Sequence, residues 1–186
     1  MHILFTLCLF FLSCSKSEDS KKSSIHDYTA NEITGSPLVI EISKKDKTSI
    51  KIQSDTLYKY NNGNILLYGG VYADLFDDNG VKSSEMHSDS ATIFNNSDSV
   101  KANGNIVVKS VKGYKLITSE ILLYNDSKLV HSNKDVLFTS NKNDTLYGTG
   151  FWSNFDMSNS KVLKPTAALL SPDVVRVIEQ LPTATF

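Results

Sequence analysis

The sequence predicts an all-β protein built from repeated antiparallel hairpins. Two observations carry this prediction. Between residues 48 and 170, apolar and polar residues alternate along short runs that end in turns rich in Asn, Asp, Ser and Gly. A unit of strand, turn, strand and turn then recurs along the chain, and no helical periodicity accompanies it before the C-terminus. We therefore expect eight or more strands.

Length and composition limit the possible functions. The chain has 186 residues, of which 40% are hydrophobic and 21% charged, enough for one ordinary domain with additional terminal segments. Its net charge of -1 leaves no basic surface of the kind that binds nucleic acid. Arg176 is the single arginine, so a phosphate site built on guanidinium groups is not expected.

The first element, residues 1–13, is predicted to be a bacterial lipoprotein signal peptide. The apolar run from Ile3 to Leu12 is too short to span a membrane, and it ends in Ser13 and Cys14 before a polar segment. Cys14 is therefore the expected lipidation site. Phe11 and the lack of a basic residue before the run depart from the usual pattern. The alternative is an ordinary secretory signal with an incidental cysteine.

Residues 14–47 are expected to form the lipidated cysteine and a flexible tether. This segment is mostly polar, with Lys-Lys and Ser-Ser pairs. One apolar stretch, Leu38 to Ile42, is a possible first strand. The predicted β domain follows over residues 48–170.

The repeat within this domain has a period of 30 residues. Met86, Leu116 and Leu146 are spaced by this interval. The same shift superposes five further pairs: Phe94 on Tyr124, Val100 on Val130, Asn103 on Asn133, Ile106 on Val136, and Val108 on Phe138. An earlier, less regular copy begins at Ser54. Units of this kind must stack to bury a face, either as a closed barrel or as a folded, open-ended double sheet.

Alternation assigns candidates for the inner face of this sheet. In the regular copies they are Val100, Ala102, Ile106, Val108, Leu122, Tyr124, Val130, Val136 and Phe138. In the irregular copy, Leu66 and Tyr68 share a face, and beyond Gly69 and Gly70 either Tyr72 or Val71 continues it. Periodicity indicates burial alone, so these residues form either a filled sandwich core or the lining of a ligand groove.

The sequence offers no catalytic, metal or cofactor motif. The four histidines lie far apart, and no nucleophile, phosphate-loop or dinucleotide pattern is present. The segment from Asp77 to Gly80 lacks the ligands of a calcium loop and is interpreted as a tight hairpin turn with Gly at a positive φ. We expect no enzyme activity, metal or cofactor.

Two features near the C-terminus have structural interpretations. Gly148 and Gly150 lie within a strand, where glycine indicates a bend or a close backbone approach, so both are predicted to be backbone requirements or a partner edge. In the tail, residues 171–186, Ser171 and Pro172 are typical of the first positions of a short helix.

An ordered set of short patterns resembles the LptC family of lipopolysaccharide export proteins. They are "FDDNG", "SDSATIF", "ANGNIVV", "LITSEILLY" and "LYGTGF", over roughly Ile50 to Leu163. The resemblance implies a β-jellyroll folded like a taco, shared with LptA and with periplasmic domains of LptF, LptG and LptD. It also implies that Tyr68 presents an aromatic ring to lipid and that Gly148 is the family's glycine.

The function implied by this resemblance is transport. The chain would be anchored through lipid at the periplasmic face of the inner membrane, would receive lipopolysaccharide from an LptB/LptF/LptG-type ABC transporter, and would pass it to an LptA-type bridge protein. Acyl chains would lie in a groove lined by Leu66, Tyr68, Tyr72, Val100, Ala102, Ile106, Val108, Leu122, Tyr124, Val136 and Phe138. The alternative is a lipid-anchored structural or protein-binding β-sandwich lipoprotein.

Overall fold

The computed structural model describes residues 30–44, 46–96 and 98–169. Within these residues the chain forms eleven strands and no helix, which confirms the predicted all-β class. The strands are β1 (Ala30–Lys44), β2 (Lys47–Tyr60), β3 (Ile65–Tyr68), β4 (Val71–Phe76), β5 (Lys82–Ser88), β6 (Ser90–Phe94), β7 (Ser99–Ser110), β8 (Lys115–Tyr124), β9 (Leu129–Thr139), β10 (Thr145–Asn154) and β11 (Lys161–Leu169). The expected helix after Ser171 lies outside the described residues.

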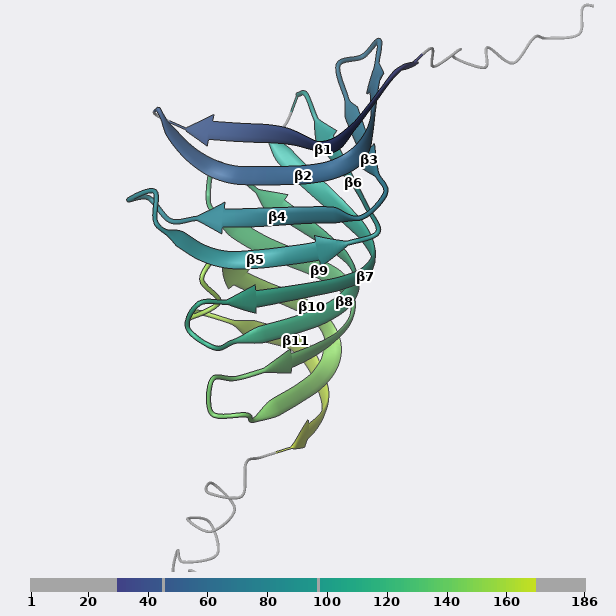
Figure 1. The fold of residues 1–186 in the computed structure, drawn as a ribbon. Coiled ribbons are helices and arrows are strands. Elements are labelled where there is room, and N and C mark those ends of the chain that lie inside the picture. The colour runs from purple at the N-terminus through teal and green to yellow at the C-terminus, as the bar shows by residue number, and fades with distance from the viewer. Residues whose placement is uncertain (1–29, 45, 97, 170–186) are drawn as a thin grey trace, which may run out of the picture.

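All strand pairs are antiparallel, and together they form one sheet that folds over on itself into two layers (Figure 1). The longer strands run through both layers and change direction between them. β4 and β5 lie in the first layer, whereas β3 and β6 lie in the second. We call the line along which the strands change layer the bend.

The pairing register breaks at the bend. In the β7–β8 pair it shifts between Asn103 and Ile106. In the β8–β9 pair it shifts between Thr118 and Leu122. The direct pairing that joins neighbouring strands is thus interrupted along one line, which lets the sheet fold there.

Glycine and serine make the bend possible. Gly104 has a φ of 76°, a conformation that side chains with a Cβ rarely adopt. On the inner side, buried serine hydroxyls donate to backbone carbonyls two residues further on, from Ser54 to Thr56 at 3.3 Å and from Ser88 to Ser90 at 3.2 Å. These hydroxyls provide hydrogen bonds at the point where the strand ladder is broken, so polar backbone can be buried there.

The 30-residue repeat corresponds to a pair of bent strands. Equivalent residues occupy equivalent places, since Val100 and Val130 are both buried in the second layer, and Ile106 and Val136 are both buried in the first. The repeated pattern in the sequence is therefore a repeated structural unit, as predicted.

Apolar side chains from both layers point into the space between them. This core consists of Ile50, Ile52, Leu57, Leu67, Val71, Ala73, Leu75, Met86, Ala91, Val100, Ala102, Ile106, Val108, Leu116, Ile121, Leu123, Val130, Val136, Phe138, Phe151, Phe155 and Met157. Burying one large apolar side chain contributes about 1.5 to 3 kcal/mol, so the core dominates the stabilisation of the fold.

The sheet begins earlier than the sequence indicates. β1 contains the expected strand from Leu38 to Ile42 but starts at Ala30, well before the predicted domain boundary at residue 48. β1 pairs with β2, and β11 pairs with β10, so β1 and β11 are the two edge strands of the folded sheet.

Candidate functional site

Six of the eleven predicted groove residues lie between the two layers. Val100, Ala102, Ile106 and Val108 are fully buried, and Val136 and Phe138 are 4% and 7% exposed. They come from β7 and β9 and belong to the continuous apolar core. The predicted orientation of these six side chains is confirmed.

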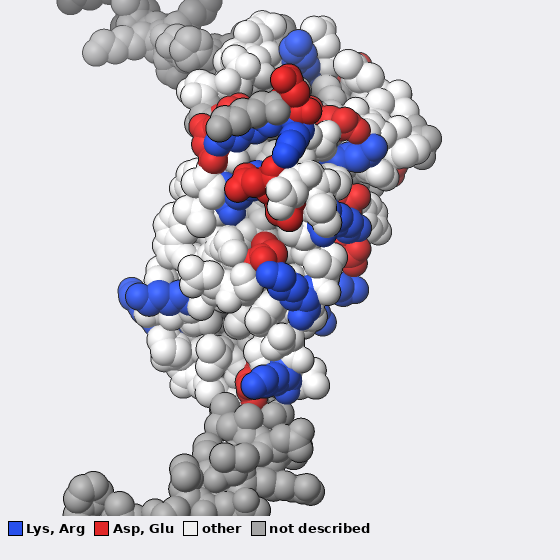
Figure 2. Space-filling view, turned by 90° about the vertical axis from the view of Figure 1, so that its left-hand side faces the viewer, with Lys and Arg blue, Asp and Glu red and all other residues white. Residues whose placement is uncertain are grey.

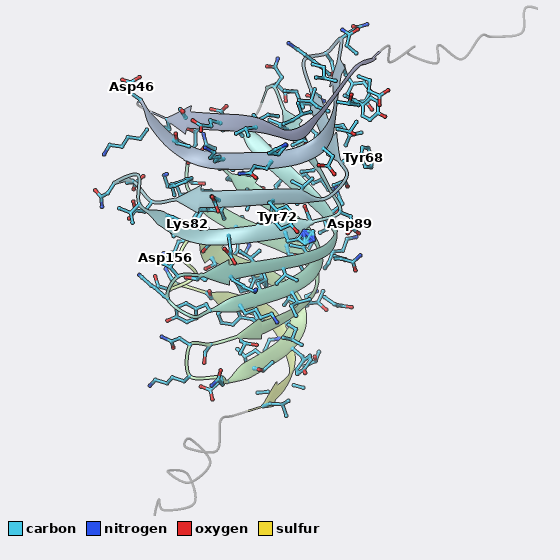
Figure 3. All side chains as sticks on the ribbon, in the orientation of Figure 1. Asp46, Tyr68, Tyr72, Lys82, Asp89 and Asp156 are labelled. Carbon is cyan, nitrogen blue, oxygen red and sulfur yellow. The ribbon has the colours of Figure 1, made fainter. Side chains whose placement is uncertain are left out.

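The other five predicted groove residues face outward, and their expected orientation is wrong. They are Leu66, Tyr68, Tyr72, Leu122 and Tyr124. The inward positions belong to their neighbours Leu67, Ile121 and Leu123 and to Val71, the predicted alternative to Tyr72, all with no exposed surface. Successive side chains in a strand point to opposite faces, so an assignment shifted by one residue inverts the whole set. Tyr68 is 46% exposed and lies on the outside near the bend (Figure 3).

The outward aromatic residues pack on one another across strands. Tyr72 of β4 stacks on His87 of β5, with ring centroids 4.6 Å apart. Trp152 of β10 stacks on His131 of β9 at 4.0 Å and on Tyr124 of β8 at 6.0 Å. Cross-strand pairs of this kind stabilise a sheet, which is a sufficient reason for apolar residues on its outer face.

The outer face of the first layer also has an open hollow of about 500 Å³. It is lined by Lys51, Gln53, Tyr72, Ala73, Asp74, Glu85, Met86, His87, Val107 and Lys109. Its carboxylates already have cationic partners, because Lys82 Nζ lies 2.7 Å from Asp74 and 3.4 Å from Glu85.

Sequence reasoning missed two interior residues in the turn between β10 and β11. Phe155 and Met157 are 2% and 0% exposed, although they lie in a polar turn. Two large apolar residues spaced by two within such a turn were the available signal. They close the core on the side opposite the bend.

Gly148 and Gly150 lie in β10, where β11 approaches closely. A Cβ on Gly148 would lie 2.4 Å from the carbonyl oxygen of Lys164 and 2.6 Å from Cγ1 of Val162. Gly150 has a φ of 83°, and a Cβ there would lie 2.9 Å from Leu163. The space around both positions fits the predicted backbone requirement.

The segment from Asp77 to Gly80 forms a hairpin turn, as predicted. The Asp77 carboxylate accepts hydrogen bonds from the backbone N–H groups of Val81 and Asn79, at 2.9 and 2.8 Å. These bonds hold the pKa of Asp77 below its ordinary value, although partial burial acts against them. Gly80 has the expected positive φ, at 80°.

Hairpin turns from the two layers meet on the side opposite the bend. The first rim consists of the β1–β2, β4–β5 and β7–β8 turns with the strand residues beside them. The second rim consists of the β8–β9 turn, residues 125–128, and the β10–β11 turn, residues 155–160. Figure 2 views this side and shows basic and acidic side chains interspersed along it.

Lys128 connects the second rim to the first. Its Nζ donates to Ser49 Oγ at 3.0 Å, to the Phe76 carbonyl at 2.7 Å and to the Asp77 carbonyl at 3.1 Å. All three N–H donors of the ammonium group are therefore used. The side chain is only 15% exposed, and this burial lowers the pKa of Lys128, with Asp78 and Asp77 acting against the shift.

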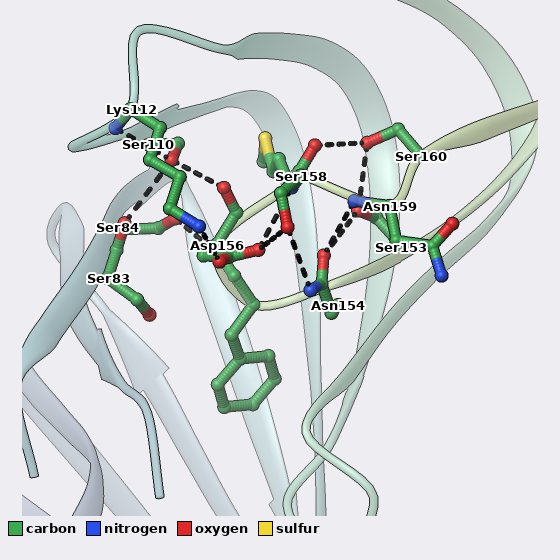
Figure 4. A network of polar contacts seen from close by, with 12 residues as sticks. Ser83, Ser84, Ser110, Lys112, Ser153, Asn154, Asp156, Ser158, Asn159 and Ser160 are labelled. Atoms are coloured by element: carbon green, nitrogen blue, oxygen red, sulfur yellow. Dashed lines mark hydrogen bonds and ion pairs between the residues drawn. The ribbon is translucent and has the colours of Figure 1, made fainter. Parts of the chain in front are cut away.

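The β10–β11 turn makes a second connection between the rims (Figure 4). Ser84 Oγ donates to the Phe155 carbonyl, and Ser110 Oγ donates to the Asp156 carbonyl, both at 2.5 Å. Lys112 Nζ contacts the Asp156 carboxylate at 2.5 Å. Partial burial disfavours the ionised form of Asp156, but hydrogen bonds from Lys112 and Ser158 outweigh it and lower the pKa of Asp156.

A third connection joins the β8–β9 turn to the end of β1. Lys44 Nζ lies 3.1 Å from the Asp126 carboxylate and also donates to the Asp126 carbonyl. The three connections join residues that are widely separated in the sequence, so they hold the two layers together along the rims.

The described residues hold no group of His, Cys, Asp and Glu side chains able to bind a metal ion. Within the same part of the chain there is no helix long and apolar enough to cross a membrane. The predicted lipidation site, Cys14, lies outside it.

Comparison with known proteins agrees with this architecture. Among curated proteins, none matches the chain in sequence. The family model for lipopolysaccharide-assembly, LptC-related proteins matches residues 1–168, which is most of the chain. An all-β fold of antiparallel bent strands around an apolar interior is the jellyroll that this family's motifs imply. The chain therefore belongs to the LptC family.

Proposed function

We propose that this chain is the inner-membrane-anchored periplasmic component of a lipopolysaccharide transport bridge. It receives lipopolysaccharide from an LptB/LptF/LptG-type ABC transporter and passes it to an LptA-type bridge protein. Family membership gives the general role in lipopolysaccharide transport. The specific position in the bridge is our proposal.

The observation that carries this proposal is the apolar interior that extends between the two layers from the β1 end to the β11 end. An acyl chain is matched to such a surface, since each buried methylene contributes about 0.8 kcal/mol. Ten methylenes would contribute roughly 8 kcal/mol, against about 0 to 1 kcal/mol for an exposed ion pair with a lipid phosphate. Acyl burial, and not headgroup charge, would therefore supply the affinity.

The two edge strands support docking to partners at both ends. β1 and β11 each have one strand neighbour, so their outer backbone groups are available for pairing with another sheet. Eight of the nine β11 residues are exposed. Because β1 follows the segment that carries the expected anchor, we assign its edge to the transporter side and the β11 edge to the bridge protein.

In-cell photocrosslinking tests the lipid path. A photoreactive phenylalanine analogue replaces Phe138, an inward aromatic residue, and in a matched variant it replaces Tyr68, an outward one. We expect crosslinks to lipopolysaccharide at Phe138 and none at Tyr68. Equal labelling would mean that lipid coats the surface. Absence of labelling at Phe138 would favour the structural or protein-binding lipoprotein.

Anchoring by lipid is tested by Cys14→Ala. Stable attachment requires the several acyl chains of a bacterial lipoprotein, because one chain binds membranes only marginally. The substitution should move the protein from the membrane fraction to the soluble periplasmic fraction in cells that lack the partner proteins. Retention in the membrane fraction would refute the lipoprotein assignment.

A further inference from the structure

The interior of the folded sheet is closed on both long sides. At the bend the chain itself crosses between the layers, and at the rims the turns meet. The core residues nearest the second rim, Phe155 and Met157, are 2% and 0% exposed, so nothing enters between the layers from this side while the rims touch.

The chemistry of lipopolysaccharide restricts how its acyl chains could reach this interior. The headgroup carries sugars, and burying such polar groups among apolar side chains without hydrogen bonds is strongly unfavourable. The molecule therefore cannot pass lengthwise between the layers. Its acyl chains must enter sideways, with the headgroup outside.

The side of entrance follows from the connectivity of the sheet. Crossing the bend would require breaking the chain, whereas the rims are held together by side chains and by turn backbone. The connections are made by Lys44, Lys112 and Lys128, and by the hydroxyls of Ser84 and Ser110. Two of the lysine side chains are substantially exposed, 33% for Lys44 and 52% for Lys112, and water can replace their partners as they separate.

We propose that the two rims form a releasable latch that parts to admit acyl chains between the layers, with Lys128 and the Asp156 turn as its principal ties. This inference rests on the proposed function, because it names the route by which lipid reaches the interior. Lys128 is the tie with the most contacts, and it joins the β8–β9 turn to both β2 and the β4–β5 turn.

A reversible lock provides the first test. In the full-length protein in detergent, Lys112→Cys and Asp156→Cys are joined by a cleavable bis-maleimide, and peptide mapping verifies the bridge. The photoreactive analogue at Phe138 then reports on added lipopolysaccharide. We expect the bridge to lower crosslinking at Phe138 by at least tenfold, and reductive cleavage of the bridge to restore it.

A second test measures the separation of the two rims in the absence of lipid. Ala102→Cys places a thiol at a core position with no exposed surface, and its modification by a small maleimide is followed by mass spectrometry. Adding Lys128→Met, which removes the donors and retains an unbranched apolar side chain, should speed this modification severalfold. The matched control is Lys142→Met, in the β9–β10 turn. Should Lys128→Met fail to fold, Lys112→Met should give a smaller increase.

The outcomes separate the latch from the transport role. Phe138 crosslinking that persists in the bridged protein would overturn the latch and leave the transport role standing. No crosslinking at Phe138 with or without the bridge would overturn the transport role. In that case the rate of thiol modification still tests the latch. Equal rates of modification of Ala102→Cys in the Lys128→Met and Lys142→Met backgrounds would refute the latch.

Discussion

The bend and the rims close the same interior by different chemistry. At the bend, bent strands continue from one layer to the other, and buried hydroxyls such as that of Ser88 bond to backbone carbonyls. At the rims, lysine side chains reach carboxylates and carbonyls of turns from the other layer. The first arrangement opens only with loss of the fold. At the rims, the exposed ion pairs of Lys44 and Lys112 contribute only about 0 to 1 kcal/mol each, and the hydrogen bonds of Lys128 are offset by the cost of burying its ammonium group. The bend is therefore closed permanently in the folded protein, whereas the rims form the weaker side of the interior.

The largest expected effect comes from crowding the bend, with Gly148→Arg. An added side chain meets the backbone of β11 at Lys164 and brings a charge into a buried position. We expect a loss of more than about 3 kcal/mol in the free energy of unfolding, measured with urea, together with weaker capture of a bridge protein at β11.

Gly70→Arg is the matched control for Gly148→Arg. Gly70 also lies at the bend and has a φ of 84°, but a Cβ there meets nothing within 4 Å. The loss in the free energy of unfolding of Gly70→Arg should be limited to about 1 to 2 kcal/mol, the cost of a left-handed backbone for a residue with a Cβ. Equal losses in the two variants would show that close approach of β11 is not what requires glycine at position 148.

Removing a hydroxyl from the bend should have the next largest effect. Ser132 is 2% exposed, donates to the Glu120 carbonyl at 2.7 Å and accepts from the Lys134 N–H at 3.1 Å. Ser132→Ala leaves both backbone groups without this partner, so we expect a loss of about 1 to 3 kcal/mol on urea unfolding. The exposed Ser119, changed to Ala, should stay within about 0.5 kcal/mol of the parent protein.

Part of the core could be predicted from sequence because its signal is local. Val100 and Ile106 alternate with polar neighbours, so their faces follow directly from the pattern. Where both faces are apolar, alternation cannot decide between them. The run from Ile121 to Tyr124 is of this kind. In the structure Leu122 and Tyr124 lie on the outer face and are partly exposed, and Tyr124 stacks there on Trp152 of β10.

The rims could not be predicted because their contacts are distant in sequence. Lys128 bonds to Ser49, 79 residues away, and Lys112 contacts Asp156, 44 residues away. A lysine in a polar turn is indistinguishable, by composition, from one that is simply solvated. Only the folding of the sheet brings these turns together, so this part of the site required the structure.

Weakening a rim should change stability less than either change at the bend. Lys128→Met removes three hydrogen bonds, but it also removes the cost of holding a partly buried ammonium group. Because these two contributions oppose each other, we expect the free energy of unfolding to change by less than about 1 kcal/mol, although a thiol at position 102 in the interior becomes more reactive. A loss as large as that of Ser132→Ala, measured in the same urea titration, would mean that the rims are as permanent as the bend.

The smallest expected effect is a pH dependence of the rims at Asp156. Its pKa is lowered from the ordinary value of 3.8, so its ionised form stabilises the folded protein. That contribution is fully present above about pH 5 and is lost as the pH falls through the lowered pKa, where protonation removes the acceptor of Lys112.

Modification of Ala102→Cys cannot report this loss at low pH, because maleimide reactivity requires the thiolate. Amide hydrogen exchange in residues 155–160, corrected for its intrinsic pH dependence, should instead show extra opening below pH 4. Asp156→Asn should show no such step, and a step that persists in this variant would assign the titration to another carboxylate.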